Sequence, residues 1–392
     1  MKQKIILIIS VFSSLICYSQ TDKFDDYSTM VDFLQKYNQD TIVLPIILDN
    51  INNSYDKNNW FTAFQDSLIV KISDEQVGFD KIELTISNPF SENLLPLSFS
   101  LIYDNNLITL FEPGKFQCLK IPEMERNLEF ESILNKRKFD YCILIDNKLV
   151  ASRRNRYFEL DSKKQKWKRY KGKKYVKKTP KLFENEKIIS FAVCHGEFGG
   201  QIFFIDKVTH NIYTVPSTCA TSVIEKENKY IVTSSLGHMM GWASIFSFSN
   251  PNELIEFNGK IRKTLKNGVC YEDLRPSNIK TELDTIFDKY SLQVFSTFDW
   301  DNKLLSIVNW KEITFLAECK GNEINIVNPL FSNGIYTHDP ITTQYNEECV
   351  LVNMDFYGIG IEKEVTCILF YQDKLIKINW TDEVVENEKL RD

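Results

Sequence analysis

The sequence has little of the residues and motifs that mark several common protein classes. It contains 14 glycines, 11 prolines and four histidines in 392 residues, too few for a collagen-like or low-complexity chain. It has no Cys-x-x-Cys pair, so neither a zinc ribbon nor a thioredoxin-type site is supported. The phosphate-binding glycine loop, the dinucleotide fingerprint, Gly-x-Ser-x-Gly and His-Glu-x-x-His are also missing. The sequence therefore gives no positive sign of an enzyme, and no cofactor is predicted.

Long apolar runs are missing after the N-terminus. The run Ile5–Ile16 follows two lysines and is shorter than a usual membrane span. The small residues that come next complete the pattern of a signal peptide cut before Gln20. We therefore predict that residues 1–19 are removed and that the protein is exported, to the periplasm or beyond the cell. Lipidation at Cys17, giving an outer-membrane lipoprotein, is the less favoured alternative.

Eight cysteines remain after such a cut, and they are scattered along the chain. An exported protein could pair them in disulfides. Most, however, fall inside apolar runs, where free cysteine behaves as a small hydrophobic residue. We expect several buried free thiols rather than a full disulfide framework.

What the sequence does have is a repeated unit. The range 188–257 contains two copies of an apolar run, a glycine-bearing loop, a second apolar run, a turn and a third run. Gly199 and Gly241 lie 42 residues apart, as do Phe204 and Phe246. A period of this length predicts stacked supersecondary units. Further copies follow at residues 304–327 and 349–380.

Short polar turns separate many of the apolar runs. Asn and Asp tolerate the left-handed conformation that tight hairpin turns need. Each of these turns leads into an apolar run, so each predicts a β-hairpin. They are Asp104-Asn105, Asp146-Asn147, Glu227-Asn228, Asp301-Asn302 and Gln372-Asp373.

Several runs are apolar on both faces, as in Ile202–Ile205, which indicates strands covered on both sides. We expect only two helices, one within residues 21–40 and one near Leu283–Tyr290, too few to cover a dozen strands. Small sheets that cover one another in a ring solve this problem. The range 100–380 thus resembles a β-propeller, although no particular propeller family is indicated. A pair of β-sandwiches is the alternative.

The predicted organisation follows from that resemblance. We expect an all-β propeller of about six irregular blades, with five to seven possible, over residues 96–380. Residues 20–95 would form a helix and strands that pack on the ring or complete it. Residues 258–290 would be an insertion with a helix, and residues 381–392 a polar tail.

Loops that join the first and second runs of each unit should lie on one rim of such a ring. Ligands commonly bind where loops converge on a rigid scaffold. Aromatic side chains there could form a platform for a glycan or a peptide, with polar groups setting its orientation. The candidate ligand-binding residues are His195, Glu197, His238, Met239, Trp242, Trp310 and Tyr357.

Three functions follow from these features, and the first two, a binding protein and an enzyme, concern the loops on this rim. A non-catalytic exported protein that binds a glycan, a peptide or another envelope component is favoured. A carbohydrate-active enzyme would need two carboxylates flanking the scissile bond, and nothing in the spacing selects a pair. A soft-metal site at His195 and His238 is conceivable, but packing between blades is favoured, so no metal is predicted.

The third function concerns charge. From Arg153 to Lys181 there are 14 lysines and arginines and two acids, while the whole chain carries −6. Export argues against nucleic acid, so an envelope protein that binds a polyanion or an anionic surface is the alternative function. Lysines that keep a solvated edge strand from pairing are the favoured explanation. The candidate polyanion-binding residues are Arg153, Arg154, Arg156, Lys166, Lys168, Arg169, Lys173 and Lys174.

Overall fold

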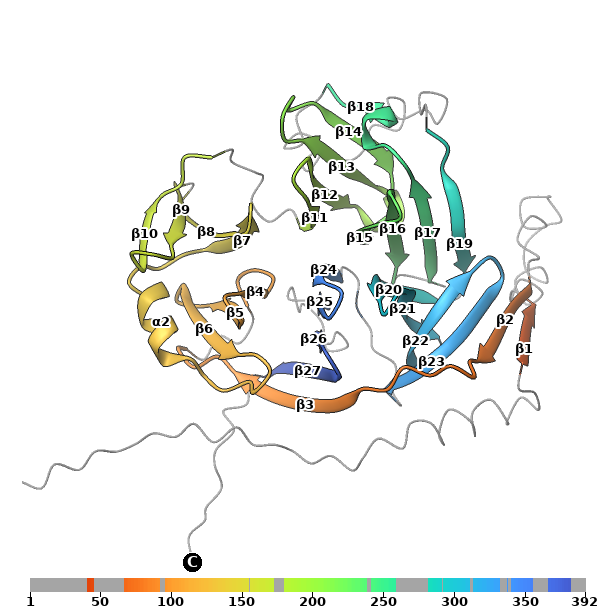
Figure 1. Cartoon of the computed structure of the whole chain (residues 1–392), viewed down its shortest axis with the longest axis horizontal. Helices are drawn as coiled ribbons and strands as arrows, with labels where there is room; N and C mark the ends of the chain where they lie inside the picture. Colours follow the sequence, from red (N-terminus) through yellow and green to blue (C-terminus); the bar gives the residue numbers. More distant parts are fainter. Residues whose placement is uncertain are drawn as a thin grey trace, which may run out of the picture.

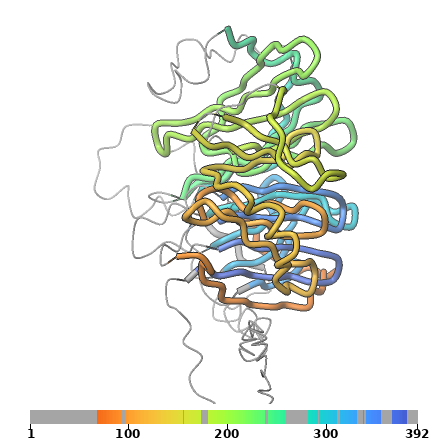
Figure 2. Tube along the Cα trace, turned by 90° about the vertical axis from the view of Figure 1, so that its left-hand side faces the viewer, coloured from red at the N-terminus to blue at the C-terminus, as the bar shows by residue number. Residues whose placement is uncertain are grey.

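The structure, a computed structural model, shows six β-sheets set around one axis (Figure 1). It describes residues 41–45, 67–91, 96–154, 156–172, 180–237, 241–258, 281–290, 292–310, 313–331, 337, 340–354 and 366–381. Turned by 90°, the strands run across the ring from one rim to the other (Figure 2). The prediction of an all-β propeller of about six blades is confirmed. The predicted N-terminal helix, signal peptide and C-terminal tail lie outside the described residues.

The blades follow one another along the chain, each starting with its inner strand. Blade 1 contains β4 (Leu101–Tyr103), β5 (Asn106–Phe111) and β6 (Lys115–Lys120), and blade 2 contains β7 (Tyr141–Ile145), β8 (Lys148–Arg153), β9 (Arg156–Asp161) and β10 (Lys166–Arg169). Blade 3 contains β11 (Lys181–Glu184), β12 (Ile188–Cys194), β13 (Gly200–Asp206), β14 (Ile212–Pro216) and β18 (Ile255–Glu256). Blade 4 contains β15 (Ala220–Lys226), β16 (Lys229–Leu236), β17 (Trp242–Phe248) and β19 (Asp284–Tyr290).

The last two blades also take strands from the start of the chain. Blade 5 contains β20 (Gln293–Trp300), β21 (Lys303–Trp310), β22 (Ile313–Lys320) and β23 (Glu323–Phe331), to which β2 (Ser67–Ile72) and β1 (Thr41–Pro45) are added. Blade 6 contains β24 (Ile341–Asn346), β25 (Cys349–Asn353), β26 (Thr366–Tyr371) and β27 (Lys374–Thr381), with β3 (Asp80–Ser87) outermost. Pro45 ends β1, an edge strand, as expected for proline.

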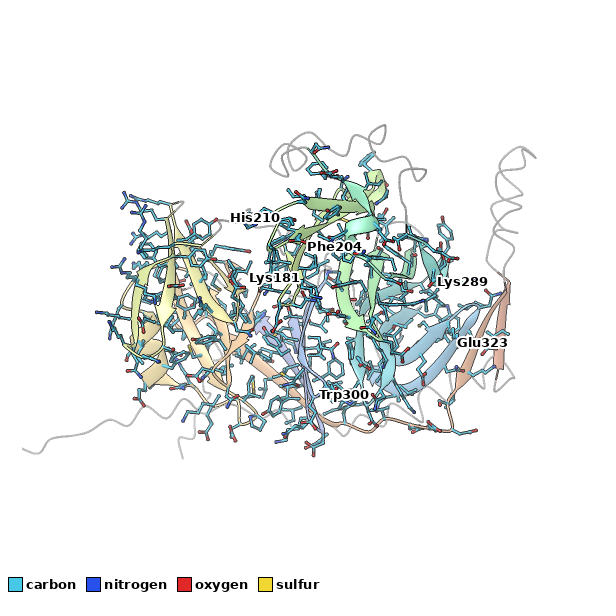
Figure 3. All side chains as sticks on the ribbon, turned by 45° about the horizontal axis from the view of Figure 1, so that its top comes forward. Lys181, Phe204, His210, Lys289, Trp300 and Glu323 are labelled. Atoms are coloured by element: carbon cyan, nitrogen blue, oxygen red, sulfur yellow. A yellow bond between two sulfur atoms is a disulfide. The ribbon has the colours of Figure 1, made fainter. Side chains whose placement is uncertain are left out.

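Six apolar clusters hold the ring together, one between each pair of neighbouring blades. Neighbouring sheets cover both faces of each blade, so the described strands are buried without helices laid across them. Phe204, labelled in Figure 3, is fully buried between blades 3 and 4. The facing pairs are represented by Phe116 and Trp167, Ile143 and Phe191, Phe204 and Phe248, Ile245 and Val308, Phe298 and Phe370, and Leu369 and Leu107.

The ring closes between blades 6 and 1. The Asn353 side chain of β25 accepts from the backbone N–H of Ser100 at 2.8 Å and donates to its carbonyl at 3.1 Å. The Tyr345 hydroxyl accepts from Ile102 N–H at 2.7 Å. On the outside, β3 pairs in parallel with all of β27, and β2 pairs in parallel with β23. β3 and β2 thus form a belt around blades 6 and 5, which runs from the lower edge to the right-hand side of Figure 1.

Blade 1 has three strands, and a short helix, α2 (Leu128–Leu134), covers its outer edge. The helix supplies the hydrogen bonds that a fourth strand would make. Asn135 accepts from Phe116 N–H at 2.7 Å and donates to its carbonyl at 2.9 Å. Glu131 accepts from Cys118 N–H at 3.1 Å. The open backbone groups of β6 are satisfied by side chains instead of by a strand.

The predicted hairpin turns are confirmed. In four of them both central residues have positive φ, between 50° and 62°, as type I′ turns require. The fifth, at Gln372-Asp373, has a positive φ at Gln372. These turns set the strand register in five blades, and they depend only on the conformational preferences of the turn residues themselves.

Two predictions near the centre of the chain were wrong. The expected helix near Leu283–Tyr290 is strand β19, because pairing along β17 outweighs the helical spacing of its apolar residues. The run at 254–257 is not the third strand of its own unit, since β18 pairs with β14 of blade 3. The chain therefore crosses from blade 4 to blade 3 and back.

The 42-residue period also has a different meaning from the expected one. Phe204 points from blade 3 toward blade 4, whereas Phe246 points from blade 4 toward blade 3, and both pack in the same cluster. Side chains alternate between the two faces of a strand, and these two residues lie on opposite faces of their own sheets. The 42-residue period therefore does not mark equivalent positions in successive blades.

Within the described residues no helix is long and apolar enough to cross a membrane.

Candidate functional site

Loops between the second and third strands of the blades share one rim, as expected. Antiparallel strands alternate in direction, so the loops β8–β9, β12–β13 and β16–β17 all turn back at the same end. We call this end the loop rim. The connections to the next blade, such as residues 217–219, turn at the same rim.

At the centre of the ring the described inner strands of neighbouring blades contact one another. The inner strands are joined there by small hydroxyl side chains, with Thr342 Oγ1 donating to Ser296 Oγ at 2.7 Å. Ser222 Oγ accepts from Thr297 N–H at 3.2 Å. A cavity of about 50 Å³ is left beside Lys181, whose side chain lies near the middle of the ring in Figure 3. That volume suits water better than a ligand.

A larger cavity, of about 330 Å³, lies between blades 3 and 4 and reaches the loop rim. We call it the 3/4 cleft. Its volume is at the lower end of the range typical of ligand pockets, about 300–1,000 Å³. No charged side chain is among the described residues that line it. These are Gly199, Gly200, Val215, Pro216, Ser217, Thr218, Ser234, Trp242, Ser244, Phe246, Leu283 and Thr285.

Strand alternation builds the blade 4 wall of the 3/4 cleft. Trp242, Ser244 and Phe246 are alternate residues of β17 and therefore point to one face. Ser234 is paired with Ser244, and Thr285 with Phe246, so both extend the same face. The wall combines two aromatic rings with three hydroxyls.

The opposite wall depends on a close backbone approach at Gly200. A Cβ atom there would lie 2.5 Å from the carbonyl oxygen of Val193 and 2.6 Å from that of Ser217. Glycine is therefore required for the β14–β15 connection to reach the cleft. Ser217 Oγ is hydrogen-bonded to Ser234 Oγ at 2.5 Å, across the two blades.

A disulfide between Cys194 and Cys219 fixes this wall. It ties the end of β12 to the connection that supplies Ser217 and Thr218. Five other described cysteines are free and buried, as the sequence predicted: Cys118, Cys142, Cys319, Cys349 and Cys367. Which pair would form could not be predicted from the sequence, because the two cysteines meet only in the folded blade.

Trp242 and Asp288 form a polar pair beside the cleft. The indole Nε1 of Trp242 donates to Asp288 Oδ1 at 2.7 Å. Partial burial raises the pKa of Asp288, and the hydrogen bond from Trp242 opposes that rise. The pair fixes the orientation of the indole ring and leaves a carboxylate at the edge of the cleft.

The β12–β13 loop presents an exposed aromatic ring next to the cleft. Phe198 is 73% exposed on a 3-10 turn, Gly196–Phe198, that begins two residues after the disulfide. It directly precedes Gly199, a lining residue. Single exposed apolar side chains are common, but this one lies beside the cleft on a loop that the disulfide ties down. The sequence had placed this loop on the rim without singling out Phe198.

The sequence-predicted ligand residues have different surroundings. Trp242 lines the cleft, while His195 and Glu197 lie on the neighbouring loop, half-buried and exposed respectively. Trp310 is 3% exposed and packs between blades 4 and 5, so its ring is not on a surface. His238, Met239 and Tyr357 lie outside the described residues. Among those that are described, no group of three His, Cys, Asp or Glu side chains could hold a metal ion.

The basic segment folds as the outer part of blade 2. β10 is an edge strand, as expected, with Lys166, Lys168 and Arg169 exposed. Its aromatic partners Tyr157, Trp167 and Tyr170 point inward and are buried. Arg153, Arg154 and Arg156 are exposed at the loop rim, and Lys173 and Lys174 lie outside the described residues.

No protein family matches this chain, and no curated protein matches it. Among solved structures, the extracellular domain of the putative hybrid two component system BT4673 from B. thetaiotaomicron is 10% identical, with a TM-score of 0.36, over 76% of this chain and 39% of that one. PorZ, a surface component of the type-IX secretion system of Porphyromonas gingivalis, is 10% identical, with a TM-score of 0.34, over 74% and 37%.

A computationally designed protein, Ika8, is 8% identical with a TM-score of 0.33, over 79% of this chain and 91% of the design. The chain spans less than half the length of the BT4673 and PorZ chains. Similarity at these identities and TM-scores does not indicate a function. The evidence for function must come from the residues of this chain.

Proposed function

We propose that the protein is an exported, non-catalytic binding protein that takes an uncharged, hydroxyl-rich ligand, a glycan, into the 3/4 cleft. The observation that carries this proposal is the lining of the cleft, with two aromatic rings, several hydroxyls and no charged side chain among its described residues. Aromatic faces bind the apolar faces of sugar rings, and hydroxyl and backbone groups set orientation.

The rigidity of the site supports binding. Trp242 is held by Asp288, and the facing wall is held by the disulfide and by the Ser217–Ser234 hydrogen bond. A site that is already ordered loses little entropy when the ligand binds. Phe198 would extend the contact from the cleft onto the loop rim.

Export is part of the proposal. It is supported by the signal-like N-terminus and by the Cys194–Cys219 disulfide, since disulfides persist in oxidising compartments. Mass spectrometry of the protein from its native cells should find a mature chain that starts at Gln20, with Cys194 and Cys219 oxidised. An intact Met1 together with two free thiols would contradict export.

Binding is tested with a glycan array followed by calorimetry. Trp242→Ala should weaken binding of any neutral glycan hit by about tenfold or more, because a fully used aromatic face contributes about 1–3 kcal/mol. Phe198→Ala should weaken it less. Val208→Ala is the matched control, because Val208 is 81% exposed but lies on the opposite rim.

Two outcomes would reject the proposal. One is a glycan whose affinity is unchanged in Trp242→Ala, which would place the site elsewhere. The other is hydrolysis of a bound glycan, which would make the protein a carbohydrate-active enzyme. Peptide binding that depends on Trp242 would keep the cleft but replace the ligand class.

A further inference from the structure

The folded chain gathers more positive charge on blade 2 than the basic segment contains by itself. The connection between α2 and β7 adds three exposed cations next to the loop rim. In residues 136–140 and 153–171 together, twelve described cations stand against three acids, Asp140, Glu159 and Asp161. The cations are Lys136, Arg137, Lys138, Arg153, Arg154, Arg156, Lys163, Lys164, Lys166, Lys168, Arg169 and Lys171. We call this set the blade 2 cation band.

The band follows the outer edge of the blade from one rim to the other. Lys163 and Lys164 lie in the β9–β10 turn, at the rim opposite the loop rim. Lys166 and Lys168 point outward from β10, and alternate residues of a strand are about 7 Å apart. Arg169 ends β10 at the loop rim, near Arg153–Arg156 of the β8–β9 loop. The charges therefore form a continuous path, not a single plane.

The blade holds this path rigidly. The Trp167 side chain points inward, and its Nε1 donates to the carbonyl of Leu134 at 2.9 Å. Alternation along β10 then places Lys166 and Lys168 outward. Local acids neutralise only part of the band, with Lys168 at 3.2 Å from Glu159 and 3.4 Å from Asp161. Charged side chains on β10 protect its edge from pairing, but many cations of the band lie outside β10 and need another explanation.

We propose that the blade 2 cation band binds a linear anionic polysaccharide that runs along β10 from rim to rim. A path of exposed charges without a buried cradle suits a polymer, whose many weak contacts add up, better than a small anion. Charges that wrap around an edge fit a flexible chain better than a flat membrane.

Nucleic acid is the other common linear polyanion. Proteins that bind single strands usually stack bases on aromatic side chains. Here Tyr157, Trp167 and Tyr170 are 6%, 7% and 9% exposed. The half-buried ring of Phe158 is covered by the Arg137 guanidinium, 4.8 Å from the ring centroid. The described part of the band therefore offers exposed cations but no exposed aromatic ring on which a base could stack, which favours a carbohydrate.

The test uses heparin and polygalacturonate as probes with the full mature chain. The triple variant Lys164→Glu, Lys166→Glu, Arg169→Glu should weaken binding at low salt by about tenfold or more, because each exposed ion pair contributes up to about 1 kcal/mol. Wild-type affinity should fall steeply with added salt. The control variant reverses three exposed lysines of other blades: Lys120, Lys187 and Lys320.

Equal losses in the two triple variants would overturn the proposal, because net charge alone would then explain binding. Tighter binding to phosphatidylglycerol vesicles or to single-stranded DNA than to both polysaccharides would also overturn it. Thermal unfolding of each variant should match wild type, as expected for exposed residues. Trp242→Ala should leave polyanion binding unchanged, so this result is independent of the 3/4 cleft.

Discussion

Replacing Glu131 by alanine should destabilise the protein by about 3 kcal/mol. Glu131 accepts from Cys118 N–H at 3.1 Å and from Arg126 Nε and Nη2, both at 2.8 Å. The carboxylate side chain is 5% exposed and the arginine side chain 24%. Its removal leaves a buried N–H of β6 without a partner, which costs about 1–3 kcal/mol. Arg126 also loses its partner, and breaking a buried pair costs about 3–5 kcal/mol.

The lower end of that range applies because Arg126 can reach water. Urea unfolding followed by tryptophan fluorescence measures the change, since Trp167 packs beside α2. Glu131→Gln should lose less, because an amide oxygen can still accept from Cys118 N–H. Glu129→Ala is the control, an exposed acid in the same helical turn. If the free energies of unfolding of Glu131→Ala and Glu129→Ala agree within about 0.5 kcal/mol, the side chains of α2 do not replace the missing strand of blade 1.

Three further predictions concern the cleft and the buried groups. Gly200→Ala should destabilise the protein by about 2 kcal/mol or more, because its Cβ would meet two backbone oxygens; unfolding equal to wild type would refute this. Burial raises the pKa of Cys142 and of Cys319 to about 12, so maleimide at pH 8 should label these thiols only after unfolding, as mass spectrometry can show. Trp242→Phe should raise the pKa of Asp288 further, because a hydrogen bond to the carboxylate is lost, and an NMR titration that shows no change would contradict this. A raised acid pKa also means that this group favours folding at low pH, a contribution lost as pH rises through its folded pKa.

Local chemistry made much of the ring predictable. Turns such as Asp146-Asn147 need only neighbouring residues to reverse the chain, and their φ angles agree. Runs that are apolar on both faces demanded covers that only other sheets could supply. The architecture and approximate blade number followed from these two facts.

Non-local pairing explains what the sequence could not show. Thr285 and Phe287 became part of a strand because β17 offered an open edge, and no nearby residue indicates this. The helix α2 stands in for a strand through Glu131 and Asn135, which look like ordinary surface residues in the sequence. The belt strands β2 and β3 pair with partners about 250 and about 290 residues later in the chain, respectively.

Only part of the candidate site could be predicted from the sequence, because the rest also depends on non-local contacts. Trp242 and the loop at 195–200 were recognised from their glycines and aromatics. Asp288 meets Trp242 only when β19 pairs with β17 in blade 4, and Ser217 joins them only when blades 3 and 4 pack together. Trp310 carried the same sequence signal as Trp242 yet is buried between sheets. Residue type alone does not distinguish an aromatic ring that lines a cleft from one that packs between sheets.

The belt has a consequence for biosynthesis. β2 and β3 leave the ribosome early, but their partners β23 and β27 are among the last strands to be made. Until then β2 can pair only with β1 and β3 lacks its partner strand, and strands with such open edges are prone to associate with other chains. A nascent chain of this design has to be kept from aggregating for most of its translation, and its final stable form is reached only when the last blade is complete.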